Sequence, residues 1–574
     1  MRDDAPARKL SVMTLAVLAV AGSALAQQSP PIDPVRASSQ VSVVNVEVVV
    51  TDRDGKPVTD LTAADFEVSE DGKPQAITNF LAGSLPAAST PDNAASQAPG
   101  VETGTPASEI VSVILFVDNA NLLPAQRDEV LKRIQVLMNG GWPGAGVQMM
   151  LASGSRAVHV VQPLTADRTR LAEGMDRLSH ETAGGGGGGV SSFMNQVMES
   201  SPGDSGSSDF GAQDRQSQLD NARSAAQEAY ERSRSYLAAQ SQFVDSLAWI
   251  PGRKIVLYLS DGLQTRPGEA VLQRFEAKYG GTVEAGFSAA SESTRYSLTH
   301  ELRTFLQRAN SSRLTFFCIP GSGGGGVSSG ADQRHMERDA SIGAGETMNQ
   351  QQALSSLAQA TGGRVLPNND AVGATISRVV DDVRNAYLLG YSNPHPDAGT
   401  YHTLQVRVKR DGVVVRHREG YLNKTPDDRM AERALAGVLA ESTSNPLDVS
   451  VSLRSATPEK DGVFSAVVLA IIPLGNVLLQ PKGDVHEGQL SLWIAVRNRE
   501  GSITQGAKQV FPLRVPNDRL LSAQGQSVGY TFQLRLREGE YRVAVAVRDD
   551  VGQVDSTAFG PIQVGALQPA EAGK

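Results

Sequence analysis

The chain has 574 residues, 40% hydrophobic and 20% charged, with a formal net charge of −9. At about 150 residues per domain this length predicts three or four domains, and a mildly acidic chain without a basic cluster is a poor candidate for a nucleic-acid-binding protein. The single cysteine, Cys318, excludes an intrachain disulfide, so stability must come from buried cores. Cys318 lies in the apolar run Leu314–Ile319, which predicts a buried and inert thiol.

The segment 1–26 has the organisation of a secretory signal peptide. Basic residues precede an apolar run from Leu10 to Val20, and Ala24-Leu25-Ala26 follows as a small-x-small cleavage site. The apolar run is too short to cross about 30 Å of hydrocarbon, and no later stretch is long and apolar enough to do so. We therefore expect cleavage after Ala26, no transmembrane segment in the mature chain, and a periplasmic or extracellular location.

Residues 41–82 are predicted to form an N-terminal β module. Val41 to Val50 is rich in β-branched residues, and the Asp54-Gly55 and Asp71-Gly72 pairs are hairpin turn signals. The Ser-, Ala-, Pro- and Gly-rich residues 83–107 are typical of a linker.

Residues 108–422 alternate between strand and helix patterns. Val111 to Val117 is an apolar run of the kind that is buried on both faces of a parallel sheet, and Lys254 to Leu259 is a second one. Helical spacing follows the first run, and a long helix from about Asp214 to Trp249 precedes the second. The pattern predicts an α/β fold with a central, doubly wound, mostly parallel sheet. Gly-rich insertions at 183–212 and 321–345, an irregular stretch at 263–292 and a terminal β hairpin complete the predicted domain.

The remaining residues return to β patterns. Residues 423–446 are predicted to be a connector helix, residues 447–566 a C-terminal β-sandwich with alternating strands, and residues 567–574 a disordered tail. The expected architecture is thus an α/β domain flanked by two all-β modules.

Two of the predicted strands end in an aspartate, Asp118 and Asp261. In an open α/β sheet, ligands bind outside the carboxyl ends of the strands. Two carboxylates that meet there would form a site of hard oxygen ligands, suited to Mg²⁺, Mn²⁺ or Ca²⁺.

These motifs resemble the von Willebrand factor A domain, and more specifically the bacterial "VWFA-related" proteins described from acidobacteria. The resemblance covers roughly residues 41–422. The A-domain pieces are the apolar strand into Asp118, the Leu164-Thr165 step before a helix, and Tyr258-Leu259-Ser260-Asp261-Gly262. The pieces shared with the bacterial proteins are Val48–Val58 with Leu61–Phe66, Ala360-Thr361-Gly362-Gly363, and Tyr387-Leu388-Leu389-Gly390-Tyr391.

The resemblance implies a metal-ion-dependent adhesion site, whose family pattern is Asp-x-Ser-x-Ser. Here Ala120 and Leu122 stand where the two serines belong, which removes two direct oxygen ligands. The candidates that remain for a ligand-binding face and for a weakly bound Mg²⁺ or Ca²⁺ are Asp118, Asn121, Thr165 and Asp261. The alternative is that Asp118 caps the following helix and Asp261 begins a glycine turn, and we favour it over tight cation binding.

Motifs for catalysis are weak. Gly203-Asp204-Ser205-Gly206 resembles a protease nucleophile motif but lies in a Gly-rich insertion without a matching base, and the eight histidines show no zinc-protease spacing. We therefore expect no enzyme, and an adhesion-type protein that recognises a protein or a cell-envelope ligand. The alternative function is a structural or assembly factor of the envelope that acts through its β modules, and a hydrolase ranks third.

Overall fold

The computed structural model describes residues 43–82, 111–140, 142, 146–181, 208–250, 252–279, 287–321, 348–366, 372–395, 399–439, 444–499 and 501–565. The predicted signal peptide, linker, tail and most of the two Gly-rich insertions lie outside the described residues. The chain divides into two compact units at Pro426, and each is described by itself.

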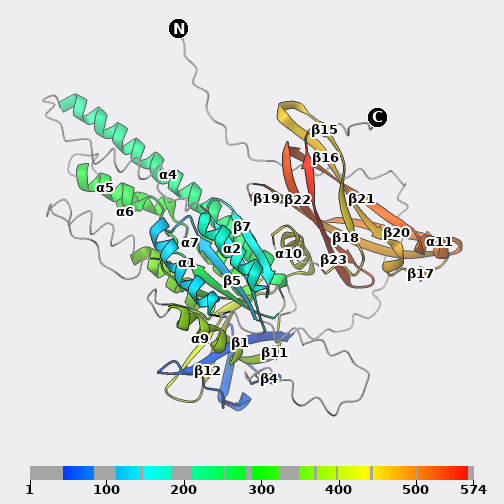
Figure 1. Ribbon diagram of the computed structural model, residues 1–574, viewed down its shortest axis with the longest axis horizontal. Helices are drawn as coiled ribbons and strands as arrows, with labels where there is room; N and C mark the ends of the chain where they lie inside the picture. The colour runs from blue at the N-terminus through cyan, green and yellow to red at the C-terminus, as the bar shows by residue number, and fades with distance from the viewer. Residues whose placement is uncertain are drawn as a thin grey trace, which may run out of the picture. The chain divides into compact units, whose positions relative to one another are not determined.

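A six-stranded sheet lies among helices at the centre of the first unit (Figure 1). Its strand order is β10-β9-β8-β5-β6-β7. All its neighbouring strands are parallel except β6 and β7, which are antiparallel. This order is that of a doubly wound sheet. Its strands are β5 (Val111–Asp118), β6 (Val147–Gly154), β7 (Val158–Thr165), β8 (Arg253–Leu259), β9 (Leu314–Ile319) and β10 (Arg364–Val365).

Helices cover both faces of this sheet because alternate residues of its apolar strands point to opposite sides. One face packs against α1 (Pro124–Asn139), α2 (Arg168–His180) and α9 (Val372–Arg384). On the other face, Phe116 contacts Phe243 of α4 (Ser208–Ser246), and Phe316 contacts Phe305 of α7 (Thr299–Ser311). Cys318 is buried and unpaired, as the apolar run predicts.

The stretch 263–292, predicted to be irregular, contains two helices instead. These are α5 (Glu269–Tyr279) and the short α6 (Ala289–Ser293). Val271, Leu272 and Phe275 lie at helical spacing and share a buried cluster with residues of α4. The prediction was wrong because the Gly and Pro residues before α5 masked this short apolar stripe. Residues 348–360 are also helical.

The strands at the two ends of the first unit form a pair of four-stranded sheets around one core. One sheet has the order β13-β1-β11-β4 and the other the order β14-β12-β2-β3. The predicted N-terminal module and the predicted terminal hairpin therefore share both sheets, although the sequence divides them between two domains. The strands are β1 (Val43–Asp52), β2 (Phe66–Glu70), β3 (Lys73–Gln75), β4 (Asn79–Leu81), β11 (Tyr387–Ser392), β12 (Tyr401–Val408), β13 (Val413–His417) and β14 (Gly420–Leu422).

The second unit consists of α10 (Pro426–Leu439) and two antiparallel sheets with a common core. The helix that the sequence predicts as a connector packs on this unit. Gly437 of α10 lies so close to Ala544 that a Cβ atom added at position 437 would be 2.7 Å from the Ala544 side chain. One sheet contains β15 (Ser450–Pro458), β16 (Val463–Pro473) and β21 (Ser527–Arg537). The other contains β17 (Gln480–Lys482), β18 (Val485–Asn498), β19 (Ile503–Gln505), β20 (Gln509–Pro516), β22 (Gly539–Asp549) and β23 (Val554–Val564), with α11 (Leu520–Gln524) following β20.

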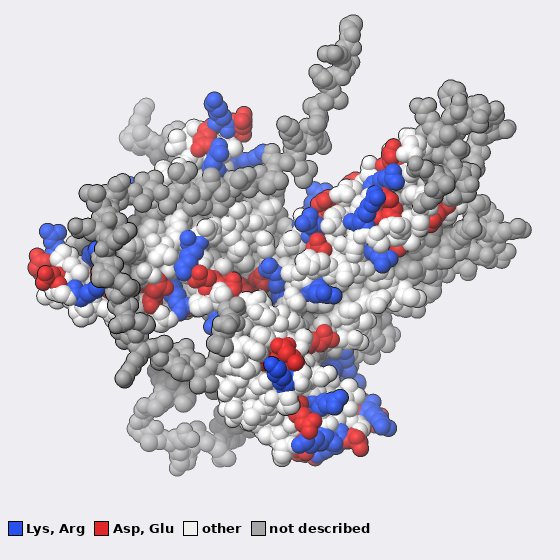
Figure 2. Space-filling model, turned by 180° about the vertical axis from the view of Figure 1, so that it is seen from behind, with Lys and Arg blue, Asp and Glu red and all other residues white. Residues whose placement is uncertain are grey.

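Acidic and basic side chains are interspersed on the face that Figure 2 shows. Ion pairs such as Arg410–Asp60 and Lys508–Asp427 join opposite charges at 2.7 and 2.8 Å. Among the described helices, none combines the length and the apolar character that crossing a bilayer requires.

Candidate functional site at the carboxyl edge of the central sheet

The switch point of the doubly wound sheet lies between β5 and β8. From β5 the chain winds outward through β6 and β7, and it returns to the other side of β5 as β8. Asp118 is the last residue of β5, and Ser260 and Asp261 follow β8. The sequence therefore places two carboxylates at the edge where ligands of such sheets bind.

The Asp118 carboxylate is buried and surrounded by hydrogen-bond donors. Its Oδ1 accepts from the Tyr236 hydroxyl at 2.9 Å and from the Asn121 backbone N–H at 3.2 Å. Its Oδ2 accepts from the hydroxyls of Ser260 and Tyr258 at 2.7 and 2.8 Å, and from Asn121 Nδ2 at 2.9 Å. A carboxylate has about four lone-pair sites, so these five donors occupy the group completely.

Burial raises the pKa of Asp118, and the hydrogen bonds from Asn121, Ser260, Tyr258 and Tyr236 act in the opposite direction. Burial, and then the charge of Asp118, raise the pKa values of Tyr236 and Tyr258 well above their usual value. Both phenols therefore stay protonated and serve as donors. A second layer supports them, because Gln240 donates to the Tyr258 hydroxyl at 3.1 Å.

Tyr236 comes from the C-terminal third of α4 and reaches Asp118 across Gly154, the last residue of β6. A Cβ on Gly154 would overlap the Tyr236 hydroxyl and lie 2.8 Å from the Phe116 ring. Glycine at this position thus provides the space for the Tyr236–Asp118 hydrogen bond. Sequence reasoning missed Tyr236, although a tyrosine on a long polar helix that must cover the sheet was an available signal.

Asn119 joins the loop after β5 to the end of α2. Its Nδ2 donates to Glu181 Oε2 at 3.1 Å, and its Oδ1 accepts from Arg127 at 3.3 Å. Arg127 also donates to the carbonyls of Ser179 and Glu181, so its guanidinium caps the C-terminus of α2. Asn119 is therefore held in place by neighbouring side chains.

Asp261 lies beside Leu122 and Gly321 at the same edge. A Cβ on Gly321 would lie 3.4 Å from both carboxylate oxygens of Asp261 and 2.5 Å from Leu122 Cδ2. Leu122 is buried in the core of the α1 face. An apolar side chain thus fills space next to Asp261 where the family pattern has a serine.

Thr165 does not belong to this edge, which corrects the prediction that groups it with Asp118. It pairs with Met149 near the start of β6, whereas Asp118 pairs with Gly154 at the end of β6. Five residues at about 3.3 Å each separate the two positions by roughly 16 Å along the strand. The cause is the antiparallel course of β7, which carries Thr165 to the opposite edge. There its hydroxyl accepts from the Asp167 N–H at 3.1 Å, and Asp167 caps α2.

The hydrogen bonds around Asp118 make this a rigid, closed arrangement. A cation at Asp118 would have to displace hydroxyl and amide donors that already satisfy the carboxylate. The Ser260 hydroxyl donates to Asp118 and accepts from the Gly262 N–H at 3.0 Å, without a described contact to a histidine that could act as its base. The expected helix-capping role of Asp118 is replaced by this network.

No family model matches the chain, and no curated protein matches it. Solved structures to which it is similar include a von Willebrand factor type A protein from Catenulispora acidiphila, with 12% identity, a TM-score of 0.23, and coverage of 80% of this chain and 66% of that chain. They also include the pilus adhesin SpaC from Lactobacillus rhamnosus GG, with 10% identity, a TM-score of 0.25, and coverage of 79% and 56%.

A third similar structure is the conserved hypothetical protein BatB from Bacteroides thetaiotaomicron, with 8% identity, a TM-score of 0.19, and coverage of 48% of this chain and 97% of that chain. The chain thus spans about two thirds of the Catenulispora protein and about half of the pilus adhesin.

Proposed function

We propose that the chain is a noncatalytic binding protein whose doubly wound domain is of the von Willebrand factor A type, and that it recognises a protein or cell-envelope ligand at the carboxyl edge of the sheet. The observation that carries the proposal is the fully occupied Asp118 carboxylate at the switch point. Its five donors fix the loop after β5, and a rigid loop of this kind supports recognition through the exposed side chains beside it.

An exposed apolar side chain marks this edge. Leu123 follows the loop after β5, occupies the N-cap position of α1 and is 59% exposed. A large apolar side chain on a rigid loop is suited to contact with a partner, because it is desolvated on binding while the loop loses little entropy. On the face that Figure 2 shows, acidic and basic side chains are mixed, so we expect apolar contacts of this kind to contribute most of the affinity.

Binding of the full chain to an envelope fraction of the bacterium that encodes it tests the proposal. Leu123→Arg should weaken sedimentation with the fraction at least tenfold, and chelation of divalent cations should leave binding unchanged. Val136→Arg is the matched control, because Val136 is 71% exposed on the same helix near its other end. Leu521→Arg tests the rival function, since Leu521 is 87% exposed in the second unit.

Three results would contradict the proposal. Loss of binding in Leu521→Arg, with Leu123→Arg unaffected, would favour an assembly factor that acts through the second unit. Loss of binding on chelation that Mg²⁺ or Ca²⁺ restores, and zinc does not, would show that a cation takes part at this edge. Equal loss in Leu123→Arg and Val136→Arg would show that the edge is not specific.

We also propose that the protein is exported and matures by cleavage after Ala26. The support is the charge order and the cleavage motif of the segment 1–26. N-terminal sequencing of the protein from periplasm or medium should begin at Gln27, and an intact Met1 on the exported protein would contradict the proposal.

A further inference from the structure

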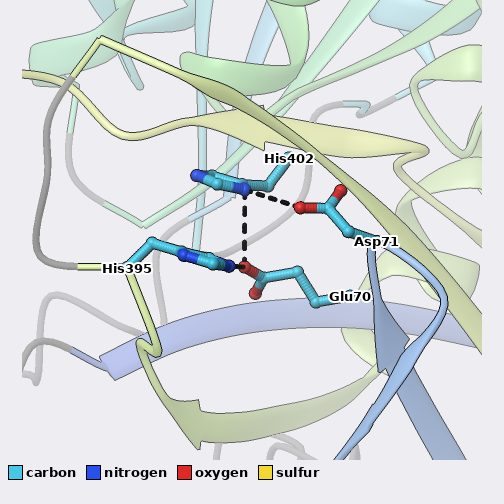
Figure 3. Close-up of side chains that lie close together, drawn as sticks. All are labelled: Glu70, Asp71, His395 and His402. Atoms are coloured by element: carbon cyan, nitrogen blue, oxygen red, sulfur yellow. Dashed lines mark hydrogen bonds and ion pairs between the residues drawn. The ribbon is translucent and has the colours of Figure 1, made fainter.

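Four metal-ligating side chains converge in the β-sheets of the first unit, away from the central sheet. Glu70 ends β2, Asp71 begins the turn that follows, His395 lies shortly after β11, and His402 is the second residue of β12. Strand β12 pairs with β2 through Leu404 and Glu70, which brings the two segments together. Figure 3 shows the four side chains facing one another.

The distances within the cluster are those of ligand atoms around one small ion. Glu70 Oε1 lies 3.5 Å from His395 Nε2 and 3.6 Å from His402 Nδ1, and His402 Nδ1 lies 2.9 Å from Asp71 Oδ2. One potential ligand atom from each residue lies within 4.8 Å of the other three. Tetrahedral zinc with bonds of about 2.0–2.1 Å holds its ligand atoms about 3.3 Å apart, close to these separations.

Glu70 provides an independent sign of a missing partner. Its side chain is 0% exposed, and Oε2 accepts hydrogen bonds from the Tyr391 and Tyr421 hydroxyls. Oε1 is buried and has no hydrogen-bond partner among the described residues. A buried carboxylate oxygen that accepts no hydrogen bond is costly, and a cation between Oε1 and the two imidazoles would remove that cost.

We propose that Glu70, Asp71, His395 and His402 bind one divalent transition-metal ion, for which zinc fits best. Two imidazoles with two carboxylates suit zinc, whereas Mg²⁺ and Ca²⁺ prefer oxygen ligands alone.

Neighbouring residues already orient the carboxylates. Tyr391 and Tyr421 fix Glu70 through Oε2. Asp71 Oδ1 accepts from the backbone N–H and the hydroxyl of Thr403 at 2.8 and 3.0 Å, which leaves Oδ2 facing His402. Such outer hydrogen bonds are typical of metal ligands.

Binding requires one adjustment of the histidine rings. The His395 and His402 rings stack at 4.4 Å with an angle of 3° between their planes, and one ion cannot lie in both parallel planes. His395 is the side chain that turns, because it is 39% exposed whereas His402 is 6% exposed. Metal binding therefore replaces the stack by a tilted pair.

The ion would have a structural role. It would join the turn after β2 to the segment between β11 and β12, which come from opposite ends of the first unit's sequence. A four-coordinate site closed by protein ligands stabilises the folded state by mass action, because the unfolded chain does not hold the four ligands together.

The test uses the full chain, freed of metal with a chelator and then dialysed against micromolar zinc. The unaltered protein should bind one zinc ion per chain more than His395→Ala. His180→Ala is the matched control, because His180 is an exposed histidine outside the cluster, and it should bind as the unaltered protein does. Zinc in hundredfold excess over its Kd should raise the melting temperature of the first unit by at least about 2 °C, and His395→Ala should lose that shift.

Cobalt(II) in place of zinc adds a readout of geometry, because four-coordinate cobalt absorbs visible light much more strongly than six-coordinate cobalt. The strong absorption should appear in the unaltered protein and be absent in His395→Ala, whose circular dichroism should be unchanged. Equal zinc stoichiometry in the two proteins would overturn the proposal, as would an equal melting shift with Mg²⁺.

Discussion

Replacing Asp118 by alanine should destabilise the first unit strongly, although the carboxylate is a buried charge. The change leaves the hydroxyls of Tyr236, Tyr258 and Ser260 without their acceptor, and all three side chains are buried. An orphaned buried donor costs about 1–3 kcal/mol, and removal of the desolvated charge offsets part of the sum. We expect a loss of about 3–5 kcal/mol for Asp118→Ala at neutral pH.

Asp118→Asn should destabilise the unit by less, about 1–2 kcal/mol. The asparagine carbonyl oxygen can accept the hydrogen bonds that Oδ2 accepts, so only the donors at the Oδ1 position then face an amide group.

The direction of the pH dependence of stability follows from the pKa of Asp118. Burial raises the pKa of Asp118 above its usual value of 3.8. The stabilising contribution of this group is therefore complete below about pH 3.8 and is lost as the pH rises through the folded-state value. The advantage of the unaltered protein over Asp118→Asn should thus be larger at acidic than at neutral pH.

The single cysteine gives an assay for this unit alone. Cys318 is buried in β9 of the central sheet, so its alkylation during a urea titration reports unfolding of that sheet whatever the second unit does. Ser241→Ala is a control on α4, because the Ser241 hydroxyl contacts only the carbonyl of Leu237 among the hydrogen bonds described for it. A loss below about 0.5 kcal/mol for Asp118→Ala would refute the network, as would a stabilisation by Mg²⁺ that depends on Asp118.

Gly154→Ala should displace the Tyr236 hydroxyl and lower the free energy of unfolding of the unit by about 1–3 kcal/mol. In the cysteine assay, the double variant Gly154→Ala with Tyr236→Phe should lose less stability than the sum of the two single losses. Ala120→Ser with Leu122→Ser restores the family pattern but removes a buried leucine, so urea unfolding should show a loss of about 2–4 kcal/mol and no gain in cation dependence. Burial lowers the pKa of His417, so its contribution is present above about pH 6.5 and lost as the pH falls through the folded-state value; His417→Gln should flatten the stability profile over that range.

The mixed α/β class and the central strands were predictable because burial on both faces leaves continuous apolar runs. Val111–Val117 and Lys254–Leu259 lie within β5 and β8, which are adjacent and parallel. Such runs mark strands but carry no information on strand direction. For this reason the antiparallel course of β7, and with it the position of Thr165, was missed.

The contacts of the site depend on tertiary structure that local patterns do not encode. Tyr236 reaches Asp118 from a helix 118 positions further along the chain. Asp71 was read only as a turn residue, and its neighbourhood to His402 follows from the pairing of β12 with β2. The histidines lack a short-range zinc motif because two of them meet carboxylates from the other end of the unit.

Strand pairing between the two ends of the first unit has a consequence for biosynthesis. Strand β1 pairs with β11 and β13, and β2 pairs with β12, so strands made early have partners that are made only after the whole central sheet. Such pairings have a high contact order, and a nascent chain carries its unpaired strand edges until β13 and β14 have emerged. During that interval the edges of β1 and β2 can pair with other chains. Production of this protein should therefore depend on factors that keep β1 and β2 of one chain from pairing with other chains until synthesis is complete.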